Sequence, residues 1–250
     1  MIGSRQWMKL SNGNLSFKAQ LSLINQILVP SSLAYVQSFL KLNNNALPIT
    51  HDKLQIPDTP IVKEAINELS STQHQAIINH SWRCFFWGTA IAQNKAWQFD
   101  QESFLIACLM HDIGLVNHSK AHSCNCFTLE SALRTEQLCL NHQYSTDKTE
   151  NISNAICLHM NGFLDEQNSS LSKEVLLLQK ATSCDVIGSD ISLIHSDFKH
   201  QILTEYPRAQ FNREMTKLIG IEARKNPKSR TATLRKLGLP LMIKMNIYKE

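Results

Sequence analysis

Glycine is scarce in this chain. Its 250 residues include only 8 glycines, at positions 3, 13, 88, 114, 162, 188, 220 and 238. The spacing excludes the GxGxxG dinucleotide fingerprint and the GxxxxGK[ST] phosphate loop, because both need closely spaced glycines to bring backbone N–H groups onto phosphate. The GxSxG motif that carries a nucleophilic serine is also missing. The three commonest glycine-based functional motifs are therefore absent.

Long apolar runs are missing as well. Polar residues interrupt the N-terminal segment, and the best later run, Leu21 to Leu40, contains Asn25, Gln26 and Pro30. We therefore expect neither a signal peptide nor a membrane span. The cysteine count of seven is odd, and most of these cysteines lie in apolar stretches, where a free thiol behaves as a small hydrophobe. We expect a reducing compartment and a cytoplasmic protein.

Charge is sparse and unevenly placed. Charged residues make up 18% of the chain, the formal net charge is +4 and the mean hydropathy is −0.21, values that are ordinary for a globular protein. The segment Arg213–Lys236 holds eight lysines and arginines against Glu214 and Glu222. Such a segment can bind nucleic acid, but a solvated helical face is the commoner explanation. We therefore expect no nucleic-acid partner.

Proline occurs only at positions 30, 48, 57, 60, 207, 227 and 240, and the stretches between are long and periodic. This pattern predicts an all-α protein, with a helical extension and connector over residues 1–55 and a single helical-bundle domain over residues 56–240. A helix should begin at Pro60, after the capping residues Asp58 and Thr59. Further helices are expected at about 14–29, 32–41, 73–94, 101–113, 127–142, 150–160, 172–187, 190–204, 211–224 and 229–237.

Four titratable residues lie within otherwise apolar helical stretches: His80, His111, Asp112 and Asp185. An ionised carboxylate at position 112, directly after an apolar run, costs several kcal/mol unless it is paired or bound to metal. His111 and Asp112 are adjacent on the helix and can hold one ion between them near its end, where Gly114 is a candidate C-cap. Two imidazoles and two carboxylates suit a divalent ion, with zinc as the first choice and iron or manganese as alternatives.

A single buried histidine or aspartate is more often a hydrogen-bonded core residue than a ligand. The combination is more specific. The order His, His-Asp, Asp, with gaps of 30 and 72 residues on a helical background, resembles the HD superfamily of metal-dependent phosphohydrolases, which is named for its His-Asp doublet. In that superfamily, four such side chains hold a metal inside a helical bundle.

A narrower resemblance extends over residues 56–208. It runs through Ile56-Pro-Asp-Thr-Pro-Ile, Asn79-His-Ser-Trp-Arg, Cys108-Leu-Met-His-Asp-Ile-Gly, Cys184-Asp-Val-Ile-Gly and Tyr206-Pro-Arg. These segments look like the cyanamide hydratase branch of the superfamily. The resemblance implies that His80, His111, Asp112 and Asp185 are metal ligands and that His159 lies near the site. The chain departs from the branch after the doublet, at Cys126-Phe-Thr-Leu-Glu-Ser-Ala, which contains Glu130.

The segment between the doublet and residue 126 contains a rival site. His118, His122, Cys124 and Cys126 place four zinc-binding groups within nine residues. The Cys-x-Cys spacing is tighter than that of usual structural zinc sites, and we prefer a plain loop. The hypothesis that Cys108 or Cys184 is a catalytic nucleophile has still less support, because no partner base lies at a defined spacing from either residue.

The resemblance implies a metal-dependent hydratase or hydrolase that adds water to a small nitrile-like substrate, as in cyanamide to urea. His159 is the candidate proton shuttle, Asp112 can share that role, and Arg83 either binds substrate or braces Asp112 or Asp185.

Two alternatives remain. The first is a phosphohydrolase acting on a nucleotide or other phosphate ester, which would need cations from Lys120, Arg134, Lys180 or Arg208 and from the basic C-terminal segment. The second is a helical binding protein without an enzymatic role. The expected partner is a small molecule, and a homo-oligomer is an open alternative to a monomer.

Overall fold

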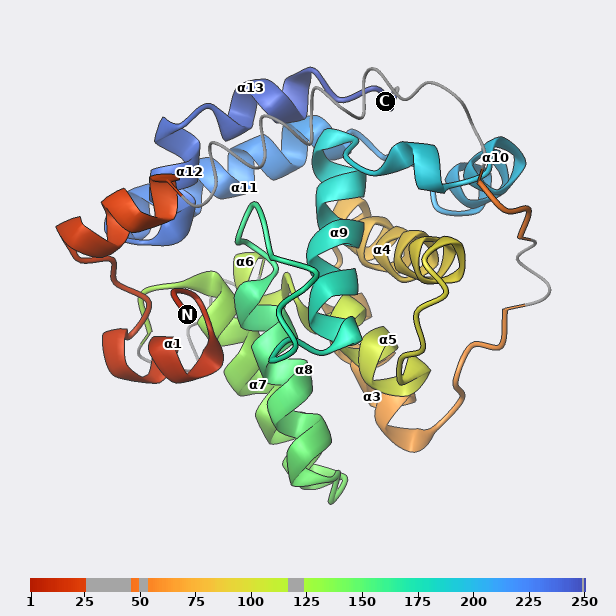
Figure 1. Cartoon of the computed structure of the whole chain (residues 1–250), viewed down its shortest axis with the longest axis horizontal. Helices are drawn as coiled ribbons and strands as arrows, with labels where there is room; N and C mark the ends of the chain where they lie inside the picture. Colours follow the sequence, from red (N-terminus) through yellow and green to blue (C-terminus); the bar gives the residue numbers. More distant parts are fainter. Residues whose placement is uncertain (26–45, 50–53, 117–123, 249) are drawn as a thin grey trace.

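The computed structural model of the protein describes residues 1–25, 46–49, 54–116, 124–248 and 250 (Figure 1). Within these residues every regular element is a helix and there is no strand, which confirms the prediction of an all-α fold. The expected helix at 32–41 lies outside the described residues, and of the expected helix at 14–29 the described part is helical over 17–25. None of the described helices is both long enough and apolar enough to cross a membrane.

Most helices match the predicted ranges. In chain order the elements are α1 (Arg5–Ser11), α3 (Pro60–Ser71), α4 (Gln75–Asn94), α5 (Gln101–Met110), α6 (Ile113–Val116), α7 (Phe127–Asn141), α8 (Thr146–Leu158), α9 (Lys173–Ile187), the 3₁₀ helix η2 (Ile191–Leu193), α10 (Ser196–Glu205), α11 (Phe211–Lys225), α12 (Arg230–Lys236) and α13 (Leu239–Lys244). Helix α3 begins at Pro60 as predicted, because proline is tolerated in a first turn.

The predicted helix at 190–204 starts too early, because the α-helix covers only Ser196–Glu205. Asp190 has a left-handed backbone, η2 ends at Leu193, and α10 starts only after His195, whose ring accepts a hydrogen bond from the Asp197 N–H. Helices α1, α6 and α13 were not predicted. Ser4 caps α1 by accepting from the Trp7 N–H, and Pro240 lies in the first turn of α13 rather than after a helix end.

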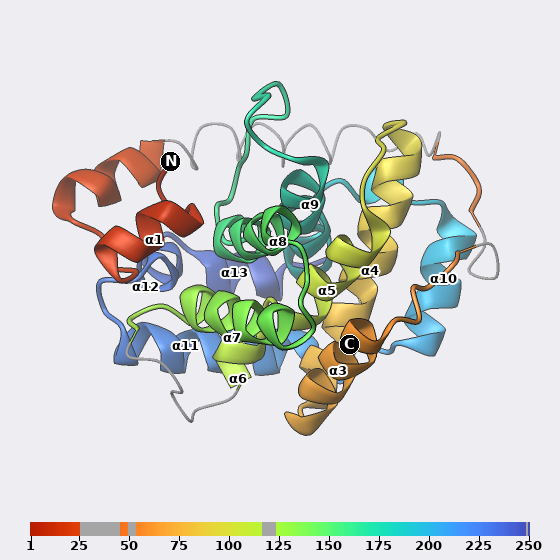
Figure 2. The same cartoon turned by 90° about the horizontal axis from the view of Figure 1, so that it is seen from below.

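Helices α4 and α5 form the centre of the molecule. Helix α4 packs against α5 and α9, helix α8 packs against α7 and α9, and α3 covers α5 (Figures 1 and 2). Helices α11, α12 and α13 pack on one another along one side of the molecule, where α11 also touches α4 and α6. The core therefore surrounds the two helices that carry His80 and the His-Asp doublet.

The doublet sits where a buried helix ends. Asp100 caps α5 by accepting from the Ser103 N–H, and every residue from Ser103 to Met110 is buried. The prediction that Gly114 is the C-cap is wrong, because this residue lies within α6. A Cβ at Gly114 would stand 2.3 Å from the Phe127 carbonyl oxygen, so glycine is needed here for the close approach of α6 to α7.

The basic segment Arg213–Lys236 is largely a solvated face, as expected. Seven of its eight cations are exposed, and Arg230 is the exception at 1% exposure. The Arg230 guanidinium donates to the Asn161 side-chain oxygen at 2.6 Å, to the Cys157 carbonyl at 2.6 Å and to the Thr128 hydroxyl at 2.9 Å. It therefore ties α12 to α7 and to the end of α8.

The contact between α4 and α5 at Gly88 provides a stability test. A Cβ at this position would lie 2.2 Å from Cζ of the buried Phe104 ring. We expect Gly88→Ala to lower the free energy of unfolding by about 1–3 kcal/mol, the usual cost of overpacking a core. The control is Gly220→Ala in α11, where the nearest atom is 3.6 Å away and the helix should gain up to about 1 kcal/mol. Urea unfolding measures both, and an unchanged midpoint for Gly88→Ala would contradict this account of the contact.

Candidate metal centre

Five titratable side chains from four helices meet in the core: His80 of α4, His111 and Asp112 at the end of α5, His159 directly after α8, and Asp185 of α9. Each is at most 5% exposed. His80 and Asp185 are 105 positions apart in the sequence. The five side chains therefore meet only because α4, α5, α8 and α9 pack together.

Local backbone geometry sets the tautomers of two histidines. His111 Nδ1 lies 2.7 Å from the Cys108 carbonyl oxygen, and His159 Nδ1 lies 2.7 Å from the Ile156 carbonyl oxygen. A carbonyl oxygen can only accept, so each Nδ1 carries the proton and each Nε2 of the neutral ring carries a lone pair. The turn at each helix end therefore aims an electron pair into the same space.

His80 is oriented in the same way by a carboxylate. Its Nδ1 lies 2.7 Å from Asp185 Oδ2, which accepts, so Nε2 of the neutral His80 ring also carries a lone pair. That Nε2 is 3.2 Å from His111 Nε2. In the neutral rings these two buried lone pairs face each other and repel. Asp112 outweighs burial and raises the pKa of His111, which favours a proton there, and either a proton or a bound cation removes the repulsion. The carboxylate–histidine arrangement is the one that commonly supports metal-binding histidines.

The three nearest donor atoms also have the spacing that a metal needs. His80 Nε2, His111 Nε2 and Asp112 Oδ2 are separated by 3.2, 3.3 and 3.6 Å. Ligand atoms about 2.0–2.2 Å from a tetrahedral zinc ion lie about 3.3–3.6 Å from one another. His159 Nε2 is 3.6 Å from the other oxygen of Asp112, Oδ1, and His111, Asp112 and His159 form a second potential ligand group. The residues present therefore fit a divalent metal.

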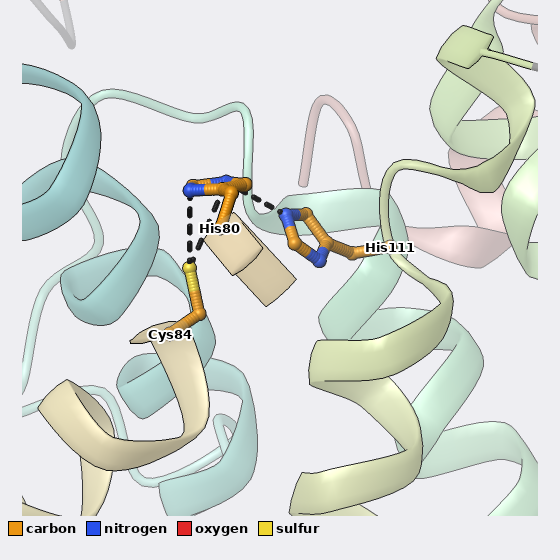
Figure 3. A group of neighbouring side chains, drawn as sticks. All are labelled: His80, Cys84 and His111. Atoms are coloured by element: carbon orange, nitrogen blue, oxygen red, sulfur yellow. Dashed lines mark hydrogen bonds between the residues drawn. The ribbon is translucent and has the colours of Figure 1, made fainter. Parts of the chain in front are cut away.

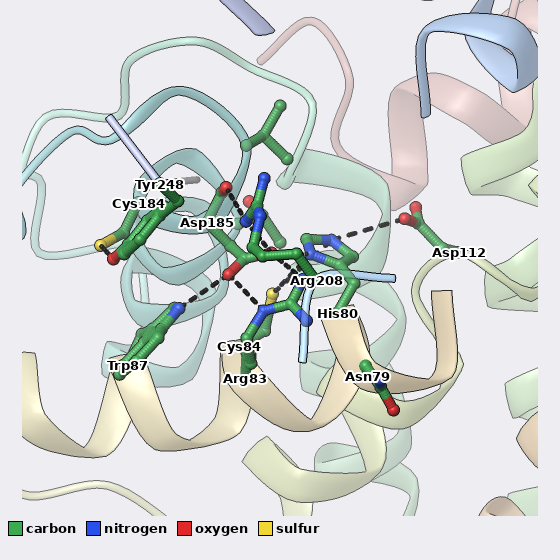
Figure 4. Close-up of polar contacts among 12 residues, drawn as sticks. Asn79, His80, Arg83, Cys84, Trp87, Asp112, Cys184, Asp185, Arg208 and Tyr248 are labelled. Atoms are coloured by element: carbon green, nitrogen blue, oxygen red, sulfur yellow. Dashed lines mark hydrogen bonds and ion pairs between the residues drawn. The ribbon is translucent and has the colours of Figure 1, made fainter. Parts of the chain in front are cut away.

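Asp185 occupies a different position in the cluster (Figure 4). Its Oδ1 accepts from Arg83 Nε at 2.7 Å and from Trp87 Nε1 at 2.8 Å, and its Oδ2 accepts from Arg83 Nη2 and His80 Nδ1, both at 2.7 Å. Arg208 Nη1 is 3.3 Å from Oδ2. A carboxylate offers about four acceptor sites, so these contacts leave none for an ion. As arranged here, Asp185 holds His80.

The charges of the cluster explain its pKa shifts. Burial alone would raise the pKa of Asp185, but the Arg83 and Arg208 guanidiniums outweigh it and hold that pKa well below the ordinary value. Burial would also raise the pKa of Asp112, but the neighbouring His111 outweighs this effect and lowers that pKa. Burial lowers the pKa of His80, and burial together with His111 lowers the pKa of His159 to about 3. Both carboxylates are therefore ionised, and His80 and His159 are neutral.

Cys84 is a further potential donor that the sequence did not indicate. Its Sγ lies one helical turn after His80 and 3.7 Å from both nitrogens of that ring (Figure 3), so it faces the ring rather than the Nε2 lone pair. His80, Cys84 and His111 satisfy the spacing of a ligand group. Burial raises the pKa of the Cys84 thiol well above its ordinary value, which keeps it neutral beside the cluster.

A cavity of about 320 Å³ opens onto this cluster. His80, His111, Asp112 and His159 line one end of it, and apolar side chains line most of the remainder. Arg83 is not among the lining residues, because its guanidinium binds Asp185 and the carbonyls of Tyr206 and Pro207. Of the two roles considered for Arg83, the structure places it in the bracing position.

Sequence patterns missed several residues around the cluster. The Phe211 ring stacks on His80 with the ring centroids 4.5 Å apart, and the Arg83 and Arg208 guanidiniums lie 5.4 and 4.7 Å from the Phe211 centroid. In the sequence, Trp87 looks like one of several aromatic core residues on the same helix. In the structure, its indole N–H donates a hydrogen bond to Asp185. Tyr206-Pro-Arg208 appeared in the resemblance, but nothing in its spacing indicates that Arg208 reaches Asp185.

The rival zinc site is only partly described, because His118 and His122 lie outside the described residues. Cys124 and Cys126 are both buried. The Cys124 thiol points to Glu130 Oε2 at 3.5 Å, and burial raises the Cys124 pKa to about 12. Burial also raises the pKa values of the Cys108 and Cys184 thiols, which disfavours a cysteine nucleophile. None of the seven cysteines forms a disulfide.

The cations considered for phosphate binding are engaged elsewhere. Arg134 Nε donates to Glu130 at 2.8 Å. Lys180 Nζ lies 2.7 Å from Glu166 and 3.2 Å from Asp190. Arg208 donates to the Asp185 carbonyl oxygen at 2.9 Å, and Lys120 lies outside the described residues. No lysine or arginine is found among the described residues that line the cavity.

Comparison with known proteins agrees with this geometry. The family described as HD domain matches residues 77–187, which include His80, the doublet, His159 and Asp185. Two cyanamide hydratases of Saccharomyces cerevisiae, DDI2 and DDI3, are each 27% identical to this chain over 161 residues. The matched region is 63% of this chain and 70% of each relative.

The geometry predicts a graded loss of metal affinity. His80→Ala, His111→Ala and Asp112→Ala should abolish measurable zinc binding, because each removes one of three mutually facing donors. Asp185→Asn should weaken zinc binding by about 10–100-fold, the usual effect of losing a carboxylate that supports a ligand histidine. His142→Ala is the control, since His142 pairs with Glu64 away from the cluster.

Zinc content and titration calorimetry on variants with an unchanged circular dichroism spectrum measure these effects. Complete zinc loss in Asp185→Asn would make Asp185 a ligand. Full zinc content in His111→Ala would contradict the assignment of the centre.

Proposed function

We propose that the chain is an HD-type, metal-dependent hydratase that adds water to a nitrile-type carbon, because residues 77–187 match the HD domain family and the chain is similar to two cyanamide hydratases. His80, His111 and Asp112 hold the metal, with zinc as the first choice. Asp185 orients His80, and joins the ligands only if it releases one of its present hydrogen bonds. A reducing, cytoplasmic setting fits seven cysteines that form no disulfide.

The observation that carries the proposal is the meeting of three donor atoms at the end of an otherwise apolar cavity. A divalent ion bound by such donors supplies Lewis acidity toward water and polar multiple bonds. The chain's own groups then fix the geometry. Asp185 and the Cys108 carbonyl hold the His80 and His111 rings, and the apolar wall excludes bulk water from the reacting atoms.

His159 is placed to move the proton that hydration requires. Addition of water to C≡N forms a C–O bond, removes a proton from the water oxygen and adds a proton to the substrate nitrogen. His159 Nε2 faces the cavity end beside Asp112 Oδ1. Its Nδ1–H stays on the Ile156 carbonyl, so Nε2 can accept the proton from water and return it to nitrogen.

The alternative of a phosphohydrolase uses the same metal centre but needs cations around a phosphate. The lining residues supply none, and Arg134, Lys180 and Arg208 are each bound to other groups. A phosphate ester would therefore place its charge against apolar side chains, which is costly without compensation. The cavity favours an uncharged substrate.

A direct assay tests the choice between the two. Zinc-loaded protein should convert cyanamide or an N-substituted cyanamide to the corresponding urea, and should release no phosphate from a panel of nucleoside phosphates. Chelation should abolish turnover and added zinc should restore it. Phosphate release that depends on His111, without any urea formation, would replace the proposal by the alternative.

The role of His159 is tested by His159→Ala. The variant should keep its zinc and its melting temperature while kcat falls by about 10²–10⁴-fold, the range that general acid–base catalysis supplies. Exposed His200 provides the matched control, His200→Ala. Loss of zinc would make His159 a ligand, and a lowered melting temperature with unchanged kcat would make it a core histidine.

A further inference from the structure

The cavity beside the metal centre is larger than a cyanamide molecule requires. Its volume is about 320 Å³, whereas a cavity of about 150 Å³ already holds a benzene ring. Cyanamide has only three non-hydrogen atoms, half as many as benzene. A substrate that reacts at the His/Asp end would leave most of this volume empty if it were cyanamide itself.

The wall of this extra volume is apolar. Beyond the metal centre, the lining is built of leucine, isoleucine, valine, methionine and phenylalanine side chains, with Thr182 and Ser183 as the polar exceptions and Gly162 beside them. The Thr182 hydroxyl donates to backbone carbonyls of its own helix, and the Ser183 hydroxyl accepts from Gln179. Both polar groups therefore have partners within the protein, and the wall offers little that a polar ligand could use.

Much of this wall comes from one part of the chain. Met215 and Ile219 of α11, Leu234 of α12, Leu237 and Met242 all line the cavity. Helices α11–α13 lie together (Figure 1) and outside residues 77–187, which match the HD family. The metal centre and most of the apolar wall therefore come from different segments of the chain.

We propose that the substrate carries its reacting carbon on a large apolar group, of the size of a linear chain of about eight carbons or of two rings, and that α11–α13 bind this group. The inference rests on the proposed hydration at the metal centre and defines its substrate class. Each methylene buried in such a cavity should strengthen binding about fourfold, the equivalent of ~0.8 kcal/mol. Affinity should stop rising once the cavity is full.

A homologous series of N-alkyl cyanamides, from methyl to dodecyl, tests the proposal. Binding to the zinc-loaded protein is measured by titration calorimetry, and kcat/KM is measured by urea formation. We expect both to increase about fourfold per methylene up to about eight carbons and then to level off. Equal kcat/KM for methyl and octyl substrates would overturn the inference while leaving hydration intact. Tight binding of the octyl compound without turnover would support the apolar site and overturn hydration instead.

Variants that fill the cavity locate the binding site. Met242→Trp should lower the octyl-to-methyl ratio of kcat/KM by tenfold or more, because the indole occupies the space of the chain. Leu237→Trp is a second variant in case the first does not fold. Leu140→Trp is the matched control, since Leu140 is 70% exposed on α7 and does not line the cavity. An unchanged ratio in a folded cavity variant would overturn the placement of the apolar group.

Discussion

The structure around the metal centre depends on one buried carboxylate. Asp185 is fully buried, and it accepts hydrogen bonds from Arg83, Trp87 and His80 while Arg208 lies against it. Its charge compensates two guanidiniums that could not otherwise be buried without a large desolvation cost. The same contacts join α4 to α9 and to the segment before α11. The orientation of His80, and with it the facing lone pairs of His80 and His111, follows from this single ion-pair network.

The sequence predicted the parts of the site that follow from local chemistry. A buried ionisable pair at the end of an apolar helix is costly unless it is paired or bound to metal, so His111 and Asp112 stood out. His159 was indicated by the family resemblance. The helix bounds followed from periodicity and proline. The failures have equally local causes: the expected helix at 190–204 begins only after the capping residue His195, and the unpredicted helix α13 has Pro240 in its first turn.

The remaining features required the fold. Arg208 and Trp87 reach Asp185 across 23 and 98 residues, and no spacing rule connects such positions. The sequence left open whether Arg83 binds substrate or supports a carboxylate, and only the structure shows that its guanidinium donates to Asp185. The cavity was not predicted at all, because its wall is assembled from side chains of α9 and α11–α13 that look like ordinary core residues in the sequence.

Phe211 lies beside the metal centre and does not line the cavity. It begins α11, stacks on His80, and packs under the Arg83 and Arg208 guanidiniums. The C-terminal helices therefore meet the metal centre through this ring, which touches one ligand histidine and both guanidiniums that hold Asp185. A change of the Phe211 ring would act on His80 and on its supporting carboxylate at the same time, although the ring itself offers no ligand atom.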